Sequence, residues 1–265
     1  MNIRFIASDV DGTILPNGGT ISERTKAAIR LCGERGIPFV ISSGRNYFTA
    51  KQVADLCGLT EGYLIIGNGG AAVDLATGKP YRRWTLPSPD ARQLLERFSE
   101  YPVRVNVFSP YGMYVCDGGM PAEEEPYPGY HIARNLPERA HRCALTDTYK
   151  LEIRTQDLAL LEHLRGMAAA EGYSVSSAYR DNLEIMAPGA GKGTAVRWLA
   201  GHLGIDCADC MAFGDYTNDL GMLRAVGHPV AVGNAVDEVK AAAEIIAERS
   251  ENDGVARIIE TYVLK

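Results

Sequence analysis

The sequence predicts an α/β fold: a doubly wound, mostly parallel, Rossmann-like sheet with a second α+β domain inserted into it. Three observations carry this prediction. Short apolar runs alternate with helical segments at both ends of the chain, as in sheets whose strands are buried on both faces. The middle of the chain breaks this pattern with prolines and alternating strands. At 265 residues the chain has room for one large or two modest domains.

The first third of the chain reads as strand and helix in turn. Ser22 is a candidate N-cap, and Gly36 follows the helix that it would begin. Helical connections between buried strands imply a parallel sheet. The expected strands are 3–8, 37–41 and 63–66, with helices from 22 to about 35 and from 47 to 56.

The middle third reads as an α+β module. Its segment 117–128 is rich in Pro, Gly and Glu and is interpreted as a solvated loop. Residues 149–155 alternate like a half-exposed strand, and Asp157 begins a helix that runs to about residue 171. The remaining expectations are a helix at 89–99 and strands at 103–108, 113–116, 173–177 and 182–187.

The last third returns to the first style. The expected elements are helices at 192–203, after 217 and at 255–263, with strands at 211–213 and 229–232. A sheet interrupted by an insertion reconciles the three parts, because the two outer pieces need each other's strands to bury their apolar faces. We therefore expect a core domain formed by 1–82 and 187–265, with an inserted domain at 83–186.

Composition excludes several classes of protein. A net charge of −6 argues against a surface that coats nucleic acid, and no apolar run approaches the roughly 20 residues of a membrane span. The amino terminus lacks a secretion-signal pattern, so a cytoplasmic location is expected, and no obligatory protein partner is inferred. Cys207 and Cys210 form an isolated Cys-x-x-Cys, which we interpret as structural rather than as half of a zinc site or a redox pair.

The most informative motif follows the first strand. Asp9 and Asp11 start on the same face of an extended chain, and Gly12 lets the backbone turn away just beyond them. Taken alone, this could be an Asp-Gly turn that closes a hairpin. Two carboxylates facing one small volume can also hold a divalent cation, or act as nucleophile and proton carrier.

Three further clusters fall at the carboxyl ends of expected strands or at a helix start, where open α/β sheets bind their ligands. Residues 42–45 (Ser-Ser-Gly-Arg) offer hydroxyls, flexible backbone and a cation. Residues 189–193 place Lys192 at a helix start, which favours anions. Residues 213–219 run from a strand into several acids. Each cluster alone is commonly a cap or a loop, so their joint placement carries the argument.

Together these segments resemble the haloacid dehalogenase-like (HAD) hydrolases, specifically the Cof-type sugar-phosphatase subfamily with a large type IIB α/β cap. The resemblance covers essentially the whole chain. One departure is Ser43, where the family usually has threonine, and a serine hydroxyl can make the same hydrogen bond. The matching motifs are Asp9-Val10-Asp11-Gly12-Thr13, Ser43-Gly44-Arg45, Gly67-Asn68-Gly69, Lys192-Gly193, Gly214-Asp215-Tyr216-Thr217-Asn218-Asp219, Gly233-Asn234-Ala235 and Asn252-Asp253-Gly254-Val255.

The resemblance implies a Mg²⁺-dependent phosphatase acting on a small phosphorylated metabolite, a sugar phosphate or similar monoester. Asp9 is then the nucleophile and Asp11 the general acid and base. Mg²⁺ would be bound by Asp9, by the backbone carbonyl of Asp11 and by Asp215, with Asp219 ligating it or orienting its waters.

The resemblance further implies a phosphate cradle and a substrate-selecting cap. Ser43, Gly44, Lys192 and Asn218 would form the cradle, with Arg45 and Asn68 as a possible rim. The cap, residues 83–186, would close over the substrate and choose the leaving group. Four cap side chains are candidates for contacting it: Arg134, Arg139, Tyr179 and Arg180.

Two alternatives stay open at this point: a phosphomutase of the same superfamily, and a non-catalytic protein that binds or regulates through a small molecule. A third possibility is disfavoured. Residues 67–72 match the dinucleotide fingerprint Gly-x-Gly-x-x-Ala, but residues 73–80 read as a hairpin and not as the long helix that the motif requires.

Overall fold

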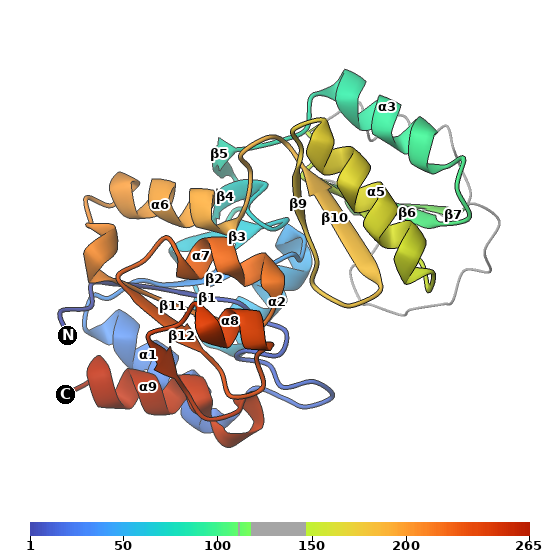
Figure 1. Cartoon of the computed structure of the whole chain (residues 1–265). Coiled ribbons are helices and arrows are strands. Elements are labelled where there is room, and N and C mark those ends of the chain that lie inside the picture. Colours follow the sequence, from blue (N-terminus) through green and yellow to red (C-terminus); the bar gives the residue numbers. More distant parts are fainter. Residues whose placement is uncertain (111, 118–146) are drawn as a thin grey trace.

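The computed structural model describes residues 1–110, 112–117 and 147–265. The chain forms two sheets, each with its own hydrophobic core, that lie next to one another (Figure 1). Strands from residues 5–83 and 210–246 build the larger sheet, and strands from residues 104–186 build the smaller one. The smaller sheet is therefore an insertion between two parts of the larger one.

The larger sheet has eight strands in the order β13-β12-β11-β1-β2-β3-β4-β5. All neighbours from β13 to β3 pair in parallel, and only β3–β4 and β4–β5 are antiparallel. This confirms the predicted mostly parallel α/β sheet. The strands are β1 (Phe5–Ser8), β2 (Phe39–Ser42), β3 (Tyr63–Ile66), β4 (Ala71–Asp74), β5 (Pro80–Arg83), β11 (Cys210–Gly214), β12 (His228–Ala231) and β13 (Ile245–Ile246).

Helices cover both faces of this sheet. In the view of Figure 1, α1 and α9 pack together below it and α6 and α7 pack together above it. Ser22 caps α1 as predicted, because its side chain accepts a hydrogen bond from the backbone N–H of Thr25. The elements are α1 (Glu23–Glu34), α2 (Tyr47–Leu56), α6 (Lys192–His202), α7 (Leu220–Leu223), α8 (Asp237–Ala241) and α9 (Gly254–Tyr262), with 3₁₀ turns η1 (Cys207–Asp209), η2 (Thr217–Asp219) and η3 (Ser250–Asn252).

The smaller sheet has five antiparallel strands in the order β7-β6-β8-β10-β9. Two helices cover the face that points away from the larger sheet (Figure 1). Asp157 caps the second of them, as predicted. The elements are α3 (Ser88–Phe98), β6 (Arg104–Ser109), β7 (Gly112–Asp117), β8 (Lys150–Arg154), α5 (Leu158–Ala170), β9 (Ser174–Ser176) and β10 (Asn182–Met186).

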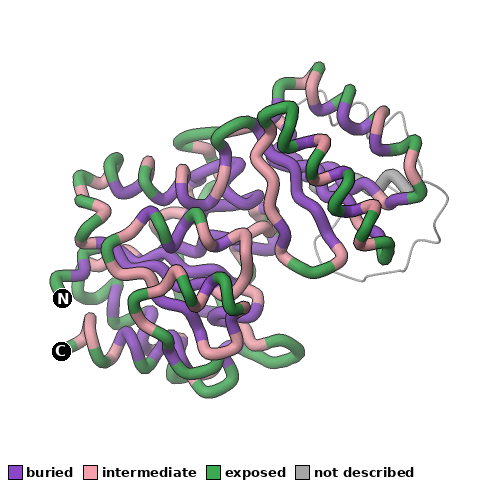
Figure 2. The backbone as a smooth tube through the Cα atoms, viewed as in Figure 1, coloured by how far each residue is buried: buried purple, intermediate pink, exposed green. Residues whose placement is uncertain are grey.

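One expectation about the smaller sheet is wrong. Residues 149–155 alternate as predicted, with Leu151 and Ile153 packed under the helices. The opposite, polar face is not solvated, however: Lys150 is 3% exposed and Glu152 is 7% exposed. Figure 2 shows that the strands of the smaller sheet are largely buried. The polar face is buried because it covers the carboxyl ends of the larger sheet's strands, and alternation alone does not reveal what a polar face is turned toward.

Smaller differences concern the end of the chain. The helix expected after residue 217 is a 3₁₀ turn followed by the single-turn α7, and the short elements β13 and α8 were not anticipated. The hairpin expected after residue 72 is present as β4 and β5, which excludes the helix of a dinucleotide site. Among the described residues, no helix is long and apolar enough to cross a membrane.

Candidate active site

Three neighbouring parallel strands deliver the predicted acids and hydroxyl to one place. β1 lies between β11 and β2, and its last residue, Ser8, is level with Phe213 and Ile41. Asp9, Ser43 and Asp215 each follow directly from one of these strands. All three line the same pocket, together with residues of the smaller sheet. The distant motifs therefore lie together at the strand ends, where the sequence analysis expected them.

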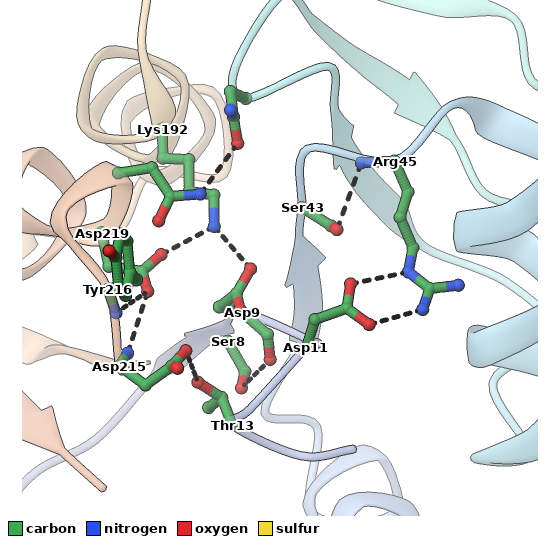
Figure 3. Close-up of polar contacts among 12 residues, drawn as sticks. Ser8, Asp9, Asp11, Thr13, Ser43, Arg45, Lys192, Asp215, Tyr216 and Asp219 are labelled. Carbon is green, nitrogen blue, oxygen red and sulfur yellow. Dashed lines mark hydrogen bonds and ion pairs between the residues drawn. The ribbon is translucent and has the colours of Figure 1, made fainter. Parts of the chain in front are cut away.

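Lys192 is the charged centre of the site. Its side chain is fully buried at the first turn of α6, and its Nζ lies 2.5 Å from Asp9 Oδ1 and 2.6 Å from Asp219 Oδ1 (Figure 3). Burial alone would lower the pKa of this ammonium, but the charges of Asp219 and Asp9 outweigh burial and hold the pKa above its ordinary value. Lys192 is therefore a permanent cation between two carboxylates.

The surroundings of Asp9 disfavour its charged form. Asp9 is 6% exposed, and burial raises the pKa of its carboxyl well above the ordinary 3.8. Lys192 opposes this shift, while the nearby charges of Asp219, Asp215 and Asp11 add to it. A further positive charge brought to the site would therefore favour the carboxylate form of Asp9.

Asp219 holds the other parts of the site in place. Its Oδ1 accepts from Lys192, and its Oδ2 accepts from the backbone N–H groups of Asp215 (2.9 Å) and Tyr216 (3.2 Å). Its carboxylate oxygens are therefore engaged with the chain itself, at 0% exposure. Of the two predicted roles, ligating Mg²⁺ or orienting its waters, this geometry disfavours the first, because both oxygens already accept from the chain.

The acids form a cluster suited to a divalent cation. One carboxylate oxygen from each of Asp9, Asp215 and Asp219 lies within 4.8 Å of the others. Burial, followed by the charge of Asp219, raises the pKa of Asp215 to about 7, although Thr13 donates a hydrogen bond of 2.9 Å to its Oδ1. Buried oxygen ligands whose charges repel each other are the environment that a hard divalent cation relieves. Asp9 and Asp215, with Asp219 behind them, are therefore oxygen donors that fit a divalent metal ion.

Because these acids lie so close together, we expect the stability of the protein, kept metal-free with a chelator, to depend on pH. An acid whose pKa is about 7 when folded and 3.8 when unfolded binds more protons in the folded state between those values. Its contribution to stability is therefore complete below about pH 4 and is lost as the pH rises toward 7, with a slope of up to about 1.4 kcal/mol per pH unit. Urea unfolding from pH 4 to 8 measures this. Asp215→Asn should flatten the decline, and equal slopes in both proteins would contradict the assignment.

Asp11 lies on the other side of Asp9 and faces Arg45. The Arg45 guanidinium holds its carboxylate with two hydrogen bonds, Nε to Oδ2 at 2.9 Å and Nη2 to Oδ1 at 2.6 Å (Figure 3). The Asp11 side chain remains 35% exposed at the pocket wall. Ser43 Oγ accepts from the backbone N–H of Arg45 at 3.3 Å, which turns the serine hydroxyl toward the pocket. Arg45 thus orients Asp11, a role that the sequence did not indicate.

The amide side chains of Asn68 and Asn218 meet at the opposite rim. Asn218 Nδ2 donates to Asn68 Oδ1 at 3.3 Å. Asn68 has a φ of 54°, a left-handed conformation that asparagine tolerates better than most residues. Gly44 lies beside this pair, because a Cβ added there would be 3.0 Å from Asn68 Oδ1. Four of the six predicted cradle and rim residues line the pocket: Ser43, Gly44, Arg45 and Asn218. Lys192 and Asn68 lie behind its wall, where they bond to the lining residues Asp9 and Asn218.

Gly12 is required by two features of the turn after β1. Its φ is +85°, and a Cβ there would lie 2.3 Å from Asp215 Oδ2. Asn234 fixes the same turn, since its Nδ2 donates to Gly12 O at 2.7 Å. We expect Gly12→Ala to destabilise the protein by about 1–3 kcal/mol and to displace Asp215. Gly18→Ala is the matched control, with a φ of +71° and no atom within 4 Å, and an equal loss in both variants would contradict the clash.

Of the four side chains on the inserted segment that were predicted to contact the substrate, two lie in the described part of the chain, and one of these lines the pocket. Tyr179 lines the pocket, whereas Arg180 is exposed and is not among the pocket residues. Arg134 and Arg139 lie outside the described residues. The sequence analysis missed Lys150 and Glu184, which are buried, form an ion pair of 2.5 Å and line the pocket. For Lys150 the available signal is the alternation of residues 149–155, which predicts a half-exposed strand; for Glu184 the sequence predicts a strand at 182–187 and does not indicate what its faces contact.

The Cys-x-x-Cys segment lies apart from this pocket. Cys210 begins β11, and its Sγ donates to the backbone carbonyl of Asp206 at 3.3 Å. Burial raises the pKa of the Cys210 thiol to about 12, which disfavours the thiolate that a zinc ligand or a redox pair needs.

Comparison with solved structures supports the fold. A haloacid dehalogenase-like hydrolase from Bacillus subtilis superimposes with a TM-score of 0.83 at 23% identity, covering 98% of this chain and 100% of the other. A HAD subclass IIB sugar phosphatase superimposes with a TM-score of 0.82 at 19% identity, covering 99% and 100%. At these identities the likeness speaks for the fold alone.

Sequence comparison identifies the family. A protein of Serratia proteamaculans (strain 568) named HMP-PP phosphatase is 32% identical over 240 residues, which are 89% of this chain and 86% of that protein. A protein of the same name from Yersinia pestis (strain Pestoides F) is 31% identical over 98% of this chain and 95% of its own length. Residues 6–259 match the family described as haloacid dehalogenase-like hydrolase. The chain therefore belongs to the haloacid dehalogenase-like hydrolase family.

Proposed function

We propose that this chain is a Mg²⁺-dependent phosphatase that hydrolyses a small phosphomonoester through a phosphorylated Asp9. The observation that carries the proposal is the buried triad of Asp9, Lys192 and Asp219, with Nζ–O distances of 2.5 and 2.6 Å. A nucleophilic carboxylate must be ionised to attack, and the buried ammonium at hydrogen-bond distance favours the ionised form of Asp9 against the burial that raises its pKa. Phosphate oxygens could then bind the same ammonium.

The proposed reaction has two steps. In the first, an Asp9 carboxylate oxygen bonds to phosphorus, the bond from phosphorus to the ester oxygen breaks, and Asp11 gives its proton to the leaving alkoxide. In the second, a water molecule gives a proton to Asp11 and attacks phosphorus, and the bond to Asp9 breaks. Inorganic phosphate leaves, and both carboxyl groups return to their starting states. In the structure Arg45 donates to both Asp11 carboxylate oxygens, so one of these hydrogen bonds must open when Asp11 carries the proton, while the other keeps the side chain in place.

The remaining polar groups would hold the phosphoryl oxygens. Lys192 Nζ contacts Asp9, and Ser43 and Asn218 line the same pocket as Asp9 from two other segments of the chain. Donors from three directions suit a group that carries charge on three oxygens. Asp9, Asp215 and the carbonyl of Asp11 would hold Mg²⁺, with Asp219 behind them. The metal would neutralise the developing negative charge on the phosphoryl group.

We propose residues 83–186 as the cap that selects the substrate. The polar face of its sheet forms one wall of the pocket and carries Arg104, Lys150, Glu152 and Arg154. A wall with charges of both signs suits a polar metabolite rather than an apolar one. The relatives named HMP-PP phosphatase make HMP-PP one candidate substrate, beside the sugar phosphates suggested by the sequence.

A phosphate-release screen tests the proposal. Sugar phosphates, nucleotides, phosphorylated small acids and HMP-PP are offered to the purified protein with Mg²⁺ and with a chelator. We expect release from at least one substrate with Mg²⁺ and a loss of release with the chelator. Isomerised product in place of free phosphate would instead indicate a phosphomutase. No turnover of any kind across the panel would indicate a non-catalytic binding protein and would overturn the proposal.

A further inference from the structure

Two buried carboxylates stand side by side on the pocket face of the cap sheet. Glu152 on β8 and Glu184 on β10 are directly opposite one another in the antiparallel register. Both are almost completely buried, at 7% and 1% exposure. The two carboxylates differ in the domain to which their hydrogen-bond partners belong. Glu152 accepts from Asn106 and Asn182, both at 3.0 Å and both in the cap. Glu184, by contrast, reaches across to the core domain.

Glu184 joins the cap to the rim of the phosphate cradle. Its Oε1 accepts from Lys150 Nζ at 2.5 Å, and its Oε2 accepts from Ser176 Oγ at 2.9 Å; all three residues belong to the cap. The same Oε2 also accepts from Asn68 Nδ2, which belongs to the core. Asn68 Oδ1 in turn accepts from Asn218 Nδ2. A continuous chain of hydrogen bonds therefore runs from the cap's ion pair to Asn218.

The carboxylate of Glu184 sets the donor and acceptor order along this series of hydrogen bonds. A carboxylate can only accept, so Asn68 must turn its NH₂ group toward Glu184. The carbonyl oxygen of Asn68 then faces Asn218, and Asn218 must turn its own NH₂ group toward Asn68 and the pocket. One hydrogen of that NH₂ is used by Asn68, and the second remains to be donated to a phosphate oxygen. Without a charge at Glu184, nothing in this relay prefers one amide orientation over the other.

We propose that Glu184 is a positioning residue that orients the amides of Asn68 and Asn218, so that closure of the cap completes the phosphate cradle from outside the core domain. This inference rests on the proposed function, because it assigns a source of order to that same phosphate site. Lys150 supports the arrangement by balancing the buried charge of Glu184, and its Nζ lies close to Gly44 in the cradle loop. Glu184 itself does not contact the phosphoryl group.

The test uses inorganic phosphate, which has no leaving group and so makes no leaving-group contact with the cap. Its dissociation constant is measured by calorimetry for the full chain with Mg²⁺. In Glu184→Gln the new amide must give its oxygen to Lys150, which only donates, and its NH₂ then faces the NH₂ of Asn68. Both asparagines are driven to flip, and Asn218 presents an oxygen to the anion. We expect about tenfold weaker phosphate binding.

Glu171→Gln is the control. It also removes a carboxylate from the cap, at the end of α5, where Glu171 pairs with Arg97, is not among the pocket residues and does not touch the relay. Phosphate affinity within about twofold of wild type is expected for this variant. A similar loss in both variants would show a general effect of charge or folding on the cap, and would overturn the proposal. Unchanged phosphate binding in Glu184→Gln would overturn it too.

A rescue variant separates positioning from structural damage. The double variant combines Asn68→Asp with Glu184→Gln. The carboxylate introduced at position 68 accepts both from the amide introduced at position 184 and from Asn218, so Asn218 returns to its original orientation. We expect tighter phosphate binding than in Glu184→Gln alone, and binding no tighter would contradict the relay. If Glu184→Gln does not fold, Asn68→Ala interrupts the relay from the core side, and unchanged affinity there overturns the proposal.

Failure of this inference can be told apart from failure of the proposed function. If wild type releases phosphate from a substrate and binds inorganic phosphate, the phosphatase proposal stands whatever Glu184→Gln does. If wild type neither turns over nor binds phosphate, both proposals fall together.

Discussion

Replacing Asp9 with asparagine is expected to lower kcat for phosphate release by about four to six orders of magnitude, the usual cost of losing a covalent nucleophile. The fold should survive, because the amide is isosteric with the carboxylate and Lys192 keeps its second partner, Asp219, at 2.6 Å. The substitution also removes a carboxyl whose pKa is raised by burial and by the charges of Asp219, Asp215 and Asp11. The thermal midpoint of the variant should therefore be at least that of wild type near neutral pH.

Initial rates of phosphate release on the best substrate of the screen measure this loss. Asp55→Asn is the matched control, because Asp55 is an exposed acid on α2 that pairs only at the surface with Lys51. Its kcat should stay within about twofold of wild type. A kcat in Asp9→Asn within about tenfold of wild type would contradict nucleophilic catalysis by Asp9.

Replacing Lys192 with methionine should combine a large catalytic loss with a large loss of stability. The ammonium is bound to Asp9 and Asp219, both buried, and its removal leaves two carboxylates without their cation. Breaking a buried ion pair from one side costs about 3–5 kcal/mol of unfolding free energy. Loss of a preorganised charge aimed at the phosphoryl group costs about 10³-fold in kcat. We expect both losses in this one variant.

The two losses are measured by urea unfolding and by initial rates. Lys51→Met removes an exposed ammonium that pairs with Asp55 at 2.6 Å, so it should change the free energy of unfolding by less than about 1 kcal/mol and leave kcat intact. At low pH, protonation of Asp9, whose pKa burial raises, should narrow the stability gap between Lys192→Met and wild type. A Lys192→Met protein as stable as wild type near neutral pH would show that the buried triad does not stabilise the fold.

The core fold could be predicted because its signals are local and redundant. Strands β1, β2, β3 and β11 are apolar runs buried on both faces, which exclude a half-solvated sheet. Caps such as Ser22 and Asp157 mark helix starts by their own side-chain hydrogen bonds. Elements that depend on tertiary contacts were missed or shortened: β13 is only two residues long, and α7 is a single turn that packs against α6.

The candidate site was predictable to the same degree. Asp9, Ser43 and Asp215 follow strands that pair in parallel, so their convergence follows from the fold class. The hydrogen-bond partners of the site side chains, by contrast, could not be predicted from the fold class. Arg45 donates to Asp11, and Glu184 accepts from Asn68. Both contacts depend on side-chain rotamers and on how the two domains are placed, which the spacing of residues in the sequence does not predict. The polar face of β8 shows the limit most clearly, because a face turned toward another domain and one turned toward water have the same alternation.

The most direct test of the account is to trap the phosphorylated carboxylate during turnover. Wild-type protein is quenched while it hydrolyses its substrate, the acyl phosphate is reduced with borohydride, and the peptides are analysed by mass spectrometry. We predict homoserine in place of aspartate at position 9, dependent on substrate and absent from the unreacted protein. Conversion at another acid, or steady release of phosphate without any conversion at position 9, would contradict the central claim that Asp9 attacks phosphorus.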